Sequence, residues 1–378
     1  MRHHHLSVQT NAQTAASTTT TPPVTPSTPS KRDPTSDTES AKETLLYTDS
    51  LDYHHHPDSP TPIQFGHGVW SAVYKASSLP APPTPDSDSD SALITPPASP
   101  ASKNRIVAVK SPIRKDAHPV LEAEARVLTR LSLTPGAERY IVPFLGYIPR
   151  SHALVMGAVP LALSSYITEE AVKAQERRST TNMFEPVLGK QRWISLAQRL
   201  ISGLDWMHNT AGVVHGDIKP HNILLRRVPA VSGEEEFGYE PLYADFSSAH
   251  DTSSTTSSPA PGSALTPPFA APELLSPAAL KSPTGAQPTT ASDVFSLAVT
   301  LLAAATGDLL LYPGASHMQR LAMAREGHRV VEFARSGGNG MRVARGGVVE
   351  GVVRGAVVKE PGERVGAGEW VELVMNVE

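Results

Sequence analysis

Short stretches in which apolar and polar residues alternate lie in the first half of the chain. FGHGVWSAVYKA (65–76) ends in such an alternation after two glycines and predicts a strand pair around a glycine turn. RIVAVK (105–110) is rich in β-branched residues, which favour strands. YIVPFLGYI (140–148) and ALVMGAV (153–159) predict two more strands. The first half of the chain is therefore predicted to contain a β-sheet.

Helical spacing dominates the remaining patterned segments. Residues 119–133 place apolar side chains three and four positions apart, with good helix formers between them. Residues 190–212 predict an amphipathic helix that ends at Gly212, a residue type common just after a helix. The longest apolar run, 294–305, is too short to span a bilayer and predicts a buried helix. Strands early and helices late indicate an α+β fold with two lobes, the first rich in strands and the second helical.

Four segments lack this patterning and are rich in Ser, Thr and Pro, and the whole chain contains 35 prolines. Such segments bury too little apolar surface to offset the entropy lost on ordering. Residues 1–45 are predicted to be a disordered tail. Residues 77–104, 250–268 and 276–290 are predicted to be low-complexity insertions within the folded part.

Composition argues against several classes of function. The formal net charge of −4 gives no support to a nucleic-acid binder. The chain has no cysteine, which excludes disulfides, thiolate zinc sites and cysteine nucleophiles and favours a reducing compartment. The N-terminus has no apolar signal-peptide region, and the histidine runs at 3–5 and 54–56 are interpreted as solvated sequence more readily than as metal ligands. We therefore expect a cytoplasmic or nuclear protein with no membrane and no nucleic-acid partner.

The stretch VVHGDIKPHNILL (213–225) sets polar side chains between two apolar anchors. Asp217 can accept a proton from a hydroxyl, and the amide oxygen of Asn222 can bind a divalent cation. Lys219 supplies a positive charge beside a phosphoryl group in transfer. Asp245, at the end of another short predicted strand, offers a second oxygen ligand to a hard cation. The alternative interpretation is an ordinary loop carboxylate with an Asx turn.

Upstream residues predict a phosphate-binding arrangement. Gly66 and Gly68 lack side chains and permit a backbone turn to approach a bulky anion, although an ordinary hairpin turn uses such glycines too. Lys110 ends a strand and could contact phosphates or be an edge-strand charge. Glu124 is preferred to Glu122 as its ion-pair partner, because Glu124 lies beside the apolar stripe of the predicted helix.

Taken in order along the chain, these motifs resemble those of the eukaryotic-type serine/threonine protein kinase family. The matching stretches are GHGVWSAV, VAVK, HGDIKPHNILL, DFS, AAPELL and SDVFSLAVTLLAAATG. The resemblance covers roughly residues 63–378, with an N-lobe of about 63–157 and a C-lobe of about 158–378. It implies a two-lobed protein-kinase-like fold. It also implies transfer of the γ-phosphoryl group of ATP, with Mg²⁺, to Ser or Thr hydroxyls of a protein substrate.

The resemblance implies a role for each matched residue. Gly66 and Gly68 would cover the ATP phosphates, Lys110 paired with Glu124 would contact the α- and β-phosphates, and Asp217 would accept the substrate proton. The other implied contacts are Lys219 at the γ-phosphate, Asn222 and Asp245 on Mg²⁺, Val73 and Ala108 on adenine, Met156 guarding the pocket, and the backbone from Gly157 to Val159 at the base. Lys219 followed by Pro220 favours Ser/Thr over Tyr substrates.

Three structural contacts are expected as well. Arg364 is expected to pair with Glu273 of the AAPELL motif, by resemblance to the family. Asp293 is expected to cap the start of its helix and to brace the loop that carries Asp217. His215 is expected to be a buried histidine that bonds backbone atoms rather than a proton carrier.

The sequence departs from the family pattern at Gly216, where the family often has an Arg that pairs with a phosphate on the activation segment. Ser247 replaces the glycine after Asp-Phe and restricts the backbone torsions of that segment. Residues 308–358 match the family poorly and are expected to be irregular. These departures motivate the alternative hypothesis of a pseudokinase, a nucleotide-binding or scaffold module without turnover.

Many Ser-Pro and Thr-Pro pairs occur in the proline-rich segments. They are candidate sites for proline-directed kinases, although such sequence also produces these pairs by chance. They include Thr25, Thr28, Ser59, Thr84, Ser99, Ser258, Ser276 and Ser282.

Overall fold

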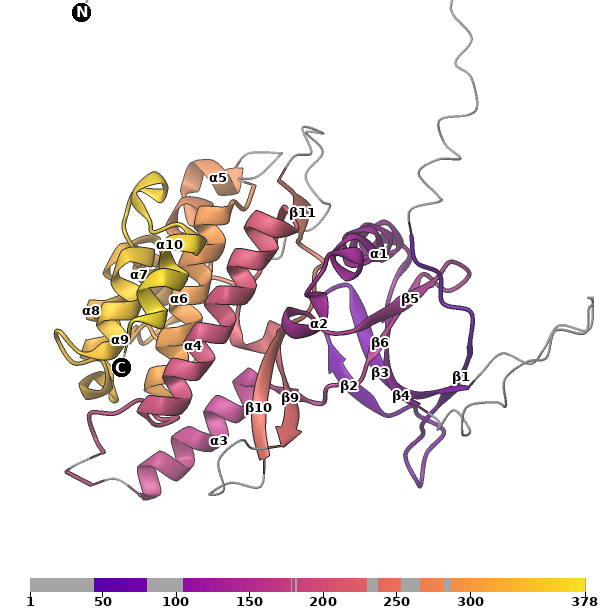
Figure 1. The fold of residues 1–378 in the computed structure, drawn as a ribbon, viewed down its shortest axis with the longest axis horizontal. Coiled ribbons are helices and arrows are strands. Elements are labelled where there is room, and N and C mark those ends of the chain that lie inside the picture. The colour runs from indigo at the N-terminus through magenta and orange to yellow at the C-terminus, as the bar shows by residue number, and fades with distance from the viewer. Residues whose placement is uncertain are drawn as a thin grey trace, which may run out of the picture. The chain divides into compact units, whose positions relative to one another are not determined.

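The computed structural model describes residues 44–79, 105–177, 179–180, 182–229, 237–252, 266–281 and 287–377. The first lobe of this part is an antiparallel sheet with strand order β1-β3-β4-β6-β5, in which β2 pairs with β3 beside β1 (Figure 1). Its strands are β1 (Ser50–Tyr53), β2 (Gln64–His67), β3 (Ser71–Leu79), β4 (Arg105–Pro112), β5 (Phe144–Ile148) and β6 (Ala153–Gly157). β6 ends at Gly157, where the N-lobe is predicted to end.

Helix α1 (His118–Leu133) lies beside the sheet and confirms the helix predicted over 119–133. Pro119 occupies its first turn, where the missing N–H costs nothing. The apolar stripe of the helix, including Leu121, Leu128 and Leu131, is fully buried. Because Glu124 lies on this same buried face, the helix carries a carboxylate into the interior of the molecule.

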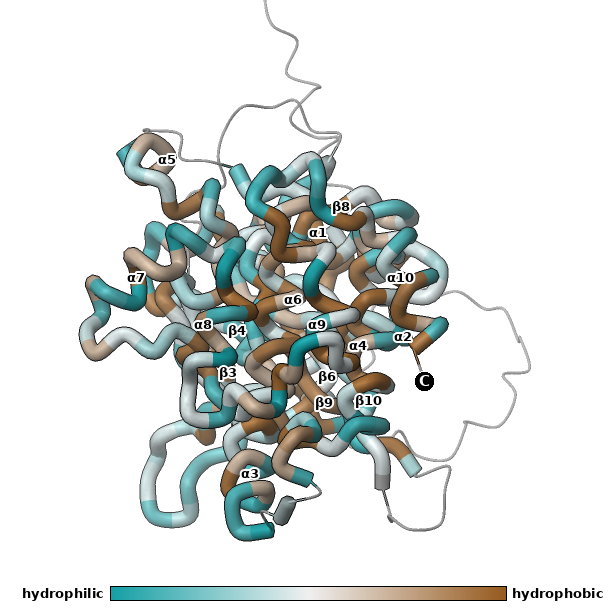
Figure 2. Tube along the Cα trace, turned by 90° about the vertical axis from the view of Figure 1, so that its left-hand side faces the viewer, coloured by the Kyte–Doolittle hydropathy of each residue, from teal (hydrophilic) through white to brown (hydrophobic). Residues whose placement is uncertain are grey.

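The second lobe is helical and is built around two long helices. α4 (Lys190–Asp205) continues into one π-helical segment (Trp206–Thr210), after which Gly212 adopts a positive φ, in line with the predicted helix end. α6 (Thr290–Thr306) has buried residues almost throughout, as predicted for the apolar run 294–305. The Trp193 indole of α4 donates to the carbonyl oxygen of Leu301 on α6 at 2.9 Å. In Figure 2 hydrophobic segments gather where α4, α6 and α9 lie, which marks the core of this lobe.

The remaining helices surround this pair. They are α2 (Ala137–Tyr140), α3 (Leu163–Glu176), α5 (Pro277–Lys281), α7 (His317–Arg325), α8 (Val330–Ser336), α9 (Val348–Val353) and α10 (Ala367–Met375). Within the parts of the chain that the structure covers, no helix is both long and apolar enough to cross a membrane.

Short strands carry the polar loops. β7 (Leu161–Ala162) and β10 (Phe237–Tyr243) pair with β9 (Ile223–Pro229), and β8 (Val213–Val214) pairs with β11 (His250–Asp251). The loop with Asp217 lies between β8 and β9, and Asp245 follows β10. The loop with Asp217 ends where β9 begins, and the segment with Asp245 begins where β10 ends. Since β9 and β10 pair antiparallel, these two places lie side by side.

Several predicted boundaries are wrong. The first lobe begins before residue 63, because β1 pairs with β3 and Leu46 forms a bridge with Tyr147. Of the predicted tail, residues 1–43 lie outside the described part of the chain. The predicted insertions also overlap regular structure: 77–79 end β3, 250–251 form β11, and 277–281 form α5. For 77–79 and 250–251, strand pairing with distant segments overrides the polar composition of these residues.

The region 308–358 is not irregular as expected. It contains α7, α8 and α9 joined by single 3₁₀ turns. Its valines, among them Val330, Val349, Val352 and Val353, are buried against the rest of the lobe. Glycines between these helices keep each one short, which hides the helical period from a reading of sequence alone.

Candidate active site

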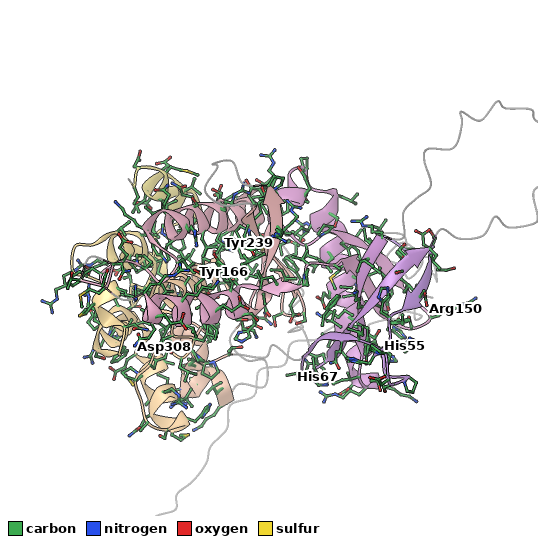
Figure 3. All side chains as sticks on the ribbon, turned by 90° about the horizontal axis from the view of Figure 1, so that it is seen from below. His55, His67, Arg150, Tyr166, Tyr239 and Asp308 are labelled. Carbon is green, nitrogen blue, oxygen red and sulfur yellow. The ribbon has the colours of Figure 1, made fainter. Side chains whose placement is uncertain are left out.

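A cleft of about 600 Å³ lies where strands of the first lobe face the loops of the second. Figure 3 shows His67, one of the residues that line the cleft, on the side of the first lobe that faces the helical lobe. The predicted site residues that line this cleft are Gly66, Gly68, Val73, Ala108, Lys110, Glu124, Met156, Gly157, Val159, Lys219, Asn222 and Asp245. Asp217 does not line the cavity itself but bonds to Lys219 and Asn222, which do.

Lys110 joins the two lobes through two carboxylates. Its Nζ lies 2.7 Å from both Oε1 and Oε2 of Glu124 and 2.7 Å from Oδ1 of Asp245. The side chains of Lys110 and Glu124 are only 6% and 1% exposed, so little water screens the pair. Burial alone would lower the pKa of Lys110, but the carboxylates of Asp245 and Glu124 outweigh it and raise that pKa well above its usual range. Lys110 is therefore a permanent cation.

Glu124, rather than Glu122, is the partner of Lys110, as predicted. Glu122 points elsewhere and lies 3.7 Å from Arg126 on the same helix. Oε1 of Glu124 also accepts a hydrogen bond from the backbone N–H of Phe246 at 3.1 Å. Burial would raise the pKa of Asp245, but the adjacent Lys110 ammonium lowers it below the usual range, so both Asp245 and its cation are charged.

The loop after β8 gathers polar groups around Asp217. Lys219 Nζ lies 2.6 Å from Oδ2 of Asp217, and the amide of Asn222 donates to the same oxygen at 3.0 Å. Thr266 donates from its hydroxyl to Oδ1 at 3.2 Å and accepts from Lys219 at 2.9 Å. Burial raises the pKa of Asp217 more than the adjacent Lys219 lowers it, so this pKa lies above its usual value.

Asp293, near the start of α6, braces this loop as predicted. Its carboxylate accepts the backbone N–H of His215 at 2.7 Å and that of Gly216 at 2.9 Å. His208 bonds to the same carboxylate at 3.0 Å. The helix cap itself is Thr289, whose side chain accepts from the backbone of Ser292. His215 is fully buried and its Nε2 lies 3.2 Å from the carbonyl oxygen of Ala244, in line with the predicted backbone-bonding role.

Asn222 and Asp245 offer oxygen atoms to a hard cation. The Asn222 amide nitrogen donates to the backbone carbonyl oxygen of Asp217 at 2.9 Å and also to the Asp217 carboxylate. The amide oxygen of Asn222 therefore faces away from Asp217. The backbone of Ala244 donates to the carbonyl of Asn222 at 2.9 Å, which sets Asp245 next to it. This pair of oxygen donors fits Mg²⁺, which binds proteins through one or two such groups. No cluster of three or more His, Cys, Asp or Glu suited to a metal occurs within the described ranges.

The Asp-Phe-Ser segment points into the protein. Phe246 is 1% exposed and its ring centroid lies 4.8 Å from that of His215. Asp245 has a φ of +60°, a conformation that costs energy in a non-glycine residue. Its bond to Lys110 offsets that cost and turns its carboxylate towards the cleft.

Thr266 is a site residue that the sequence analysis missed, because it falls inside the predicted insertion 250–268. The available signal was its place directly before the apolar run that leads into AAPELL. Ser164 and His221 also line the cleft and were not predicted: Ser164 lies in no motif, and His221 lies inside HGDIKPHNILL, where no role was assigned to it. Arg364 pairs with Glu273 as expected, with both Nη atoms 2.8 Å from the two carboxylate oxygens.

Comparisons with known proteins agree with this architecture. A family model described as the protein kinase domain matches residues 98–344, which is more than half of the chain; the glycine turn at 66–68 precedes the matched part. A crystal structure described as the kinase domain of PF14_0431 superposes with a TM-score of 0.55 at 16% identity, covering 88% of this chain and 96% of that one.

The serine/threonine-protein kinase PknK of Mycobacterium tuberculosis, from strains CDC 1551 / Oshkosh and ATCC 25618 / H37Rv, is 31% identical over 211 residues. The match covers 54% of this chain and 16% of the relative's length. With the family model spanning most of the two lobes, the chain belongs to the protein kinase domain family.

Proposed function

We propose that this chain is an active protein kinase that transfers the γ-phosphoryl group of ATP to Ser or Thr hydroxyls of protein substrates. The observation that carries the proposal is the meeting of two clusters in one cleft. One is the Lys110–Glu124–Asp245 triad, and the other is the group around Asp217. A pseudokinase has no need to keep both clusters bonded.

The roles of the charged residues follow from their surroundings. Asp217, with its raised pKa, accepts the proton of the substrate hydroxyl as its oxygen bonds to the γ-phosphorus, while the bond from that phosphorus to the bridging oxygen breaks and ADP leaves. Lys219 sits beside it and stabilises the negative charge of the phosphoryl group. Mg²⁺, held by Asn222 and Asp245, would supply further charge neutralisation on the phosphates. Lys110 holds the phosphates that remain with the nucleotide.

The apolar part of the cleft suits an adenine ring. Val73, Ala108 and Met156 line it, and the backbone from Gly157 to Val159 runs along its edge. Gly66 and Gly68 have ordinary φ values, and a Cβ at either would meet no protein atom closer than 3.7 Å. Packing within the protein therefore does not require glycine there, and a closely approaching triphosphate does.

Two features support Ser/Thr rather than Tyr as the acceptor. Lys219 bonds to Oδ2 of Asp217 and Thr266 bonds to Oδ1, and Pro220 directly follows Lys219 in the loop. The curated relative with 31% identity is named as a serine/threonine-protein kinase. The Ser-Pro and Thr-Pro pairs remain candidate sites for proline-directed kinases. Ser59 and Ser276 lie in the described part, and the other six lie outside it.

Gly216 and Ser247 favour a second candidate, a pseudokinase that binds nucleotide without turnover. The deciding experiment incubates the purified chain with γ-labelled ATP, Mg²⁺ and a generic protein substrate. We expect labelling by the wild type and its loss, by at least about a hundredfold, in Asp217→Asn. Asp58→Asn, at an exposed position, is the matched control and should label normally. Thermal stabilisation by Mg²⁺-ATP with no labelling by the wild type would favour the pseudokinase instead.

A further inference from the structure

The residues ahead of the predicted domain form a segment with no assigned role, which we call the N-terminal arm (residues 44–53). The arm bridges two distant strands of the sheet. Leu45 accepts the backbone N–H of Tyr147 on β5 at 2.8 Å, and Tyr47 donates to the carbonyl of Tyr147 at 3.0 Å. The arm then runs, in indigo in Figure 1, to β1, which pairs antiparallel with β3. It therefore covers the open edge of β5 and the far half of β3.

Gly146 shows how closely the arm approaches the sheet. Its φ is +143°, and a Cβ there would lie 2.6 Å from the backbone nitrogen of Tyr47 and 2.7 Å from the carbonyl carbon of Leu46. No side chain fits between the two backbones. Glycine at position 146 of β5 therefore allows the backbone of the arm to lie directly against this strand.

The arm also covers a second hydrophobic core that is separate from the main one. This core holds five residues of the sheet, each at most 1% exposed: Ala76, Val107, Val109, Ala153 and Val155. Tyr47, Leu51 and Tyr53 of the arm pack against it. Burial of this apolar face anchors the arm by the hydrophobic effect, independently of its hydrogen bonds.

One contact of the arm reaches α1, the helix that carries Glu124. The backbone N–H of Leu45 donates to Oγ1 of Thr129 at 2.9 Å, and the Thr129 hydroxyl donates in turn to the carbonyl of Ala125 at 2.8 Å. Thr129 is 5% exposed, so its hydroxyl is largely shielded from water, and the bond from Leu45 is partly buried. Thr129 and Ala125 are one helical turn apart, and Ala125 is the residue next to Glu124.

We propose that the N-terminal arm is a positioning element for the cleft, and that it acts through Thr129. By tying α1 to β5 and to the second core, the arm holds the helix where Glu124 meets Lys110 at 2.7 Å. Thr129 touches no reacting atom and is a positioning residue. The proposal rests on the proposed kinase function for its effect on rate, but its effect on α1 is independent of turnover.

We expect an effect on rate because the Lys110–Glu124–Asp245 triad depends on short distances between its charged atoms. Lys110 contacts Glu124 and Asp245 at hydrogen-bond distance, and a small displacement of the helix breaks the first contact. Misplacement of a reacting group by about 1 Å can cost up to about a hundredfold in rate. Loss of one partly buried hydrogen bond shifts the helix in only a fraction of molecules, so we expect a loss of about three- to tenfold in kcat.

The test is made in the full chain. Thr129→Val keeps the shape of the side chain but removes the hydroxyl, and Thr129→Ser keeps the hydroxyl and is the matched rescue. We expect Val to lower kcat about three- to tenfold with the KM for ATP changed less, and Ser to restore most of it. Hydrogen exchange of the peptide 118–133 should quicken in the Val variant and remain near wild type in the Ser variant.

A double substitution separates positioning from general stability. If Thr129 acts through Glu124, then Thr129→Val adds no further loss of phosphotransfer in a Glu124→Gln background. Independent losses that multiply, or equal exchange of α1 in the wild type and the Val variant, would overturn the proposal.

A second variant guards against loss of fold at Thr129. Leu51→Ala loosens the arm on the second core without touching α1, and it must quicken exchange in 118–133 as well; unchanged exchange there would equally count against the arm. If the wild type transfers no phosphate at all, the proposed function fails, and the exchange measurements alone still decide whether the arm holds α1.

Discussion

At the scale of single residues, the site is decided by pairs whose members lie far apart in sequence. Lys110 meets Asp245 across 135 positions, and Glu124 accepts the N–H of Phe246 across 122. The side chains of Lys110 and Glu124 are buried, so each of these two charges depends on its partners, and removal of one leaves the other uncompensated. At Gly216 this chain lacks the Arg side chain that the family pattern often has.

Gly216→Arg tests whether that position has room for the usual side chain. Gly216 has a φ of +81°, and a Cβ there would lie 2.6 Å from the carbonyl oxygen of Ser248. We expect the substitution to lower the free energy of unfolding by about 1–3 kcal/mol, because the left-handed conformation and the contact are both unfavourable for a side chain. The measurement is urea denaturation.

Gly66→Ala is the control for this experiment, since its Cβ would meet nothing within 4 Å and its φ is ordinary. The control should unfold at nearly the same urea concentration as the wild type. A Gly216→Arg protein as stable as the wild type would show that the loop relaxes around the new side chain.

At the scale of elements, α6 fixes the geometry of a loop that it does not belong to. Its Thr289 cap and buried first turn hold Asp293 at one place, and Asp293 then holds two successive backbone N–H groups of the loop before Asp217. Burial alone would raise the pKa of Asp293, but the bond to His208 and the N–H groups outweigh it, and the pKa is lowered.

Asp293→Asn should therefore destabilise the fold. One amide oxygen cannot replace a carboxylate that accepts three bonds, and we expect a loss of about 2–4 kcal/mol in the free energy of unfolding near pH 7. Because the folded pKa is lowered, the stabilisation by Asp293 is complete above the unfolded pKa of about 4 and is lost as pH falls below it. The difference between wild type and variant should shrink in that range. Asp52→Asn, on an exposed position of β1, should show neither effect.

At the scale of the whole molecule, the last part of the chain is tied back to the middle of the helical lobe. The side chain of Arg364 is 0% exposed and bonds to both oxygens of Glu273, to the carbonyl of Ala291 at 2.9 Å and to that of Val358 at 3.0 Å. Its guanidinium also lies 5.2 Å from the centre of the Phe295 ring. One side chain thus ties the segment 358–364 to Glu273 and to the start of α6.

Arg364→Lys should not be a conservative change. A lysine keeps the charge but cannot make the two parallel bonds to Glu273 and the two carbonyl bonds at once. We expect a loss of about 2–4 kcal/mol in the free energy of unfolding, measured by denaturant titration. The control is Arg354→Lys, because Arg354 is exposed, and its midpoint should not move. Equal midpoints for the two variants would contradict the structural role of Arg364.

Motifs made of neighbouring residues, and periods within one element, were determined by the sequence itself. The strand at 105–110, the helix at 119–133 and the buried run at 294–305 are present as predicted. Residue type fixes such features because local sterics and the spacing of apolar side chains suffice to define them. The family resemblance added the expected meeting of Asp217, Asn222 and Asp245.

Tertiary structure alone decided the features whose partners lie far away in sequence. Thr266 sits in a Ser/Thr/Pro-rich segment and becomes a site residue only because it reaches Asp217. The N-terminal arm mixes apolar and polar residues without a clear period, and it pairs because the edges of β3 and β5 offer it unpaired backbone groups. Residues 308–358 become short helices because their valines find a core to cover. In each case the stabilising free energy comes from contacts between distant segments, which no local pattern records.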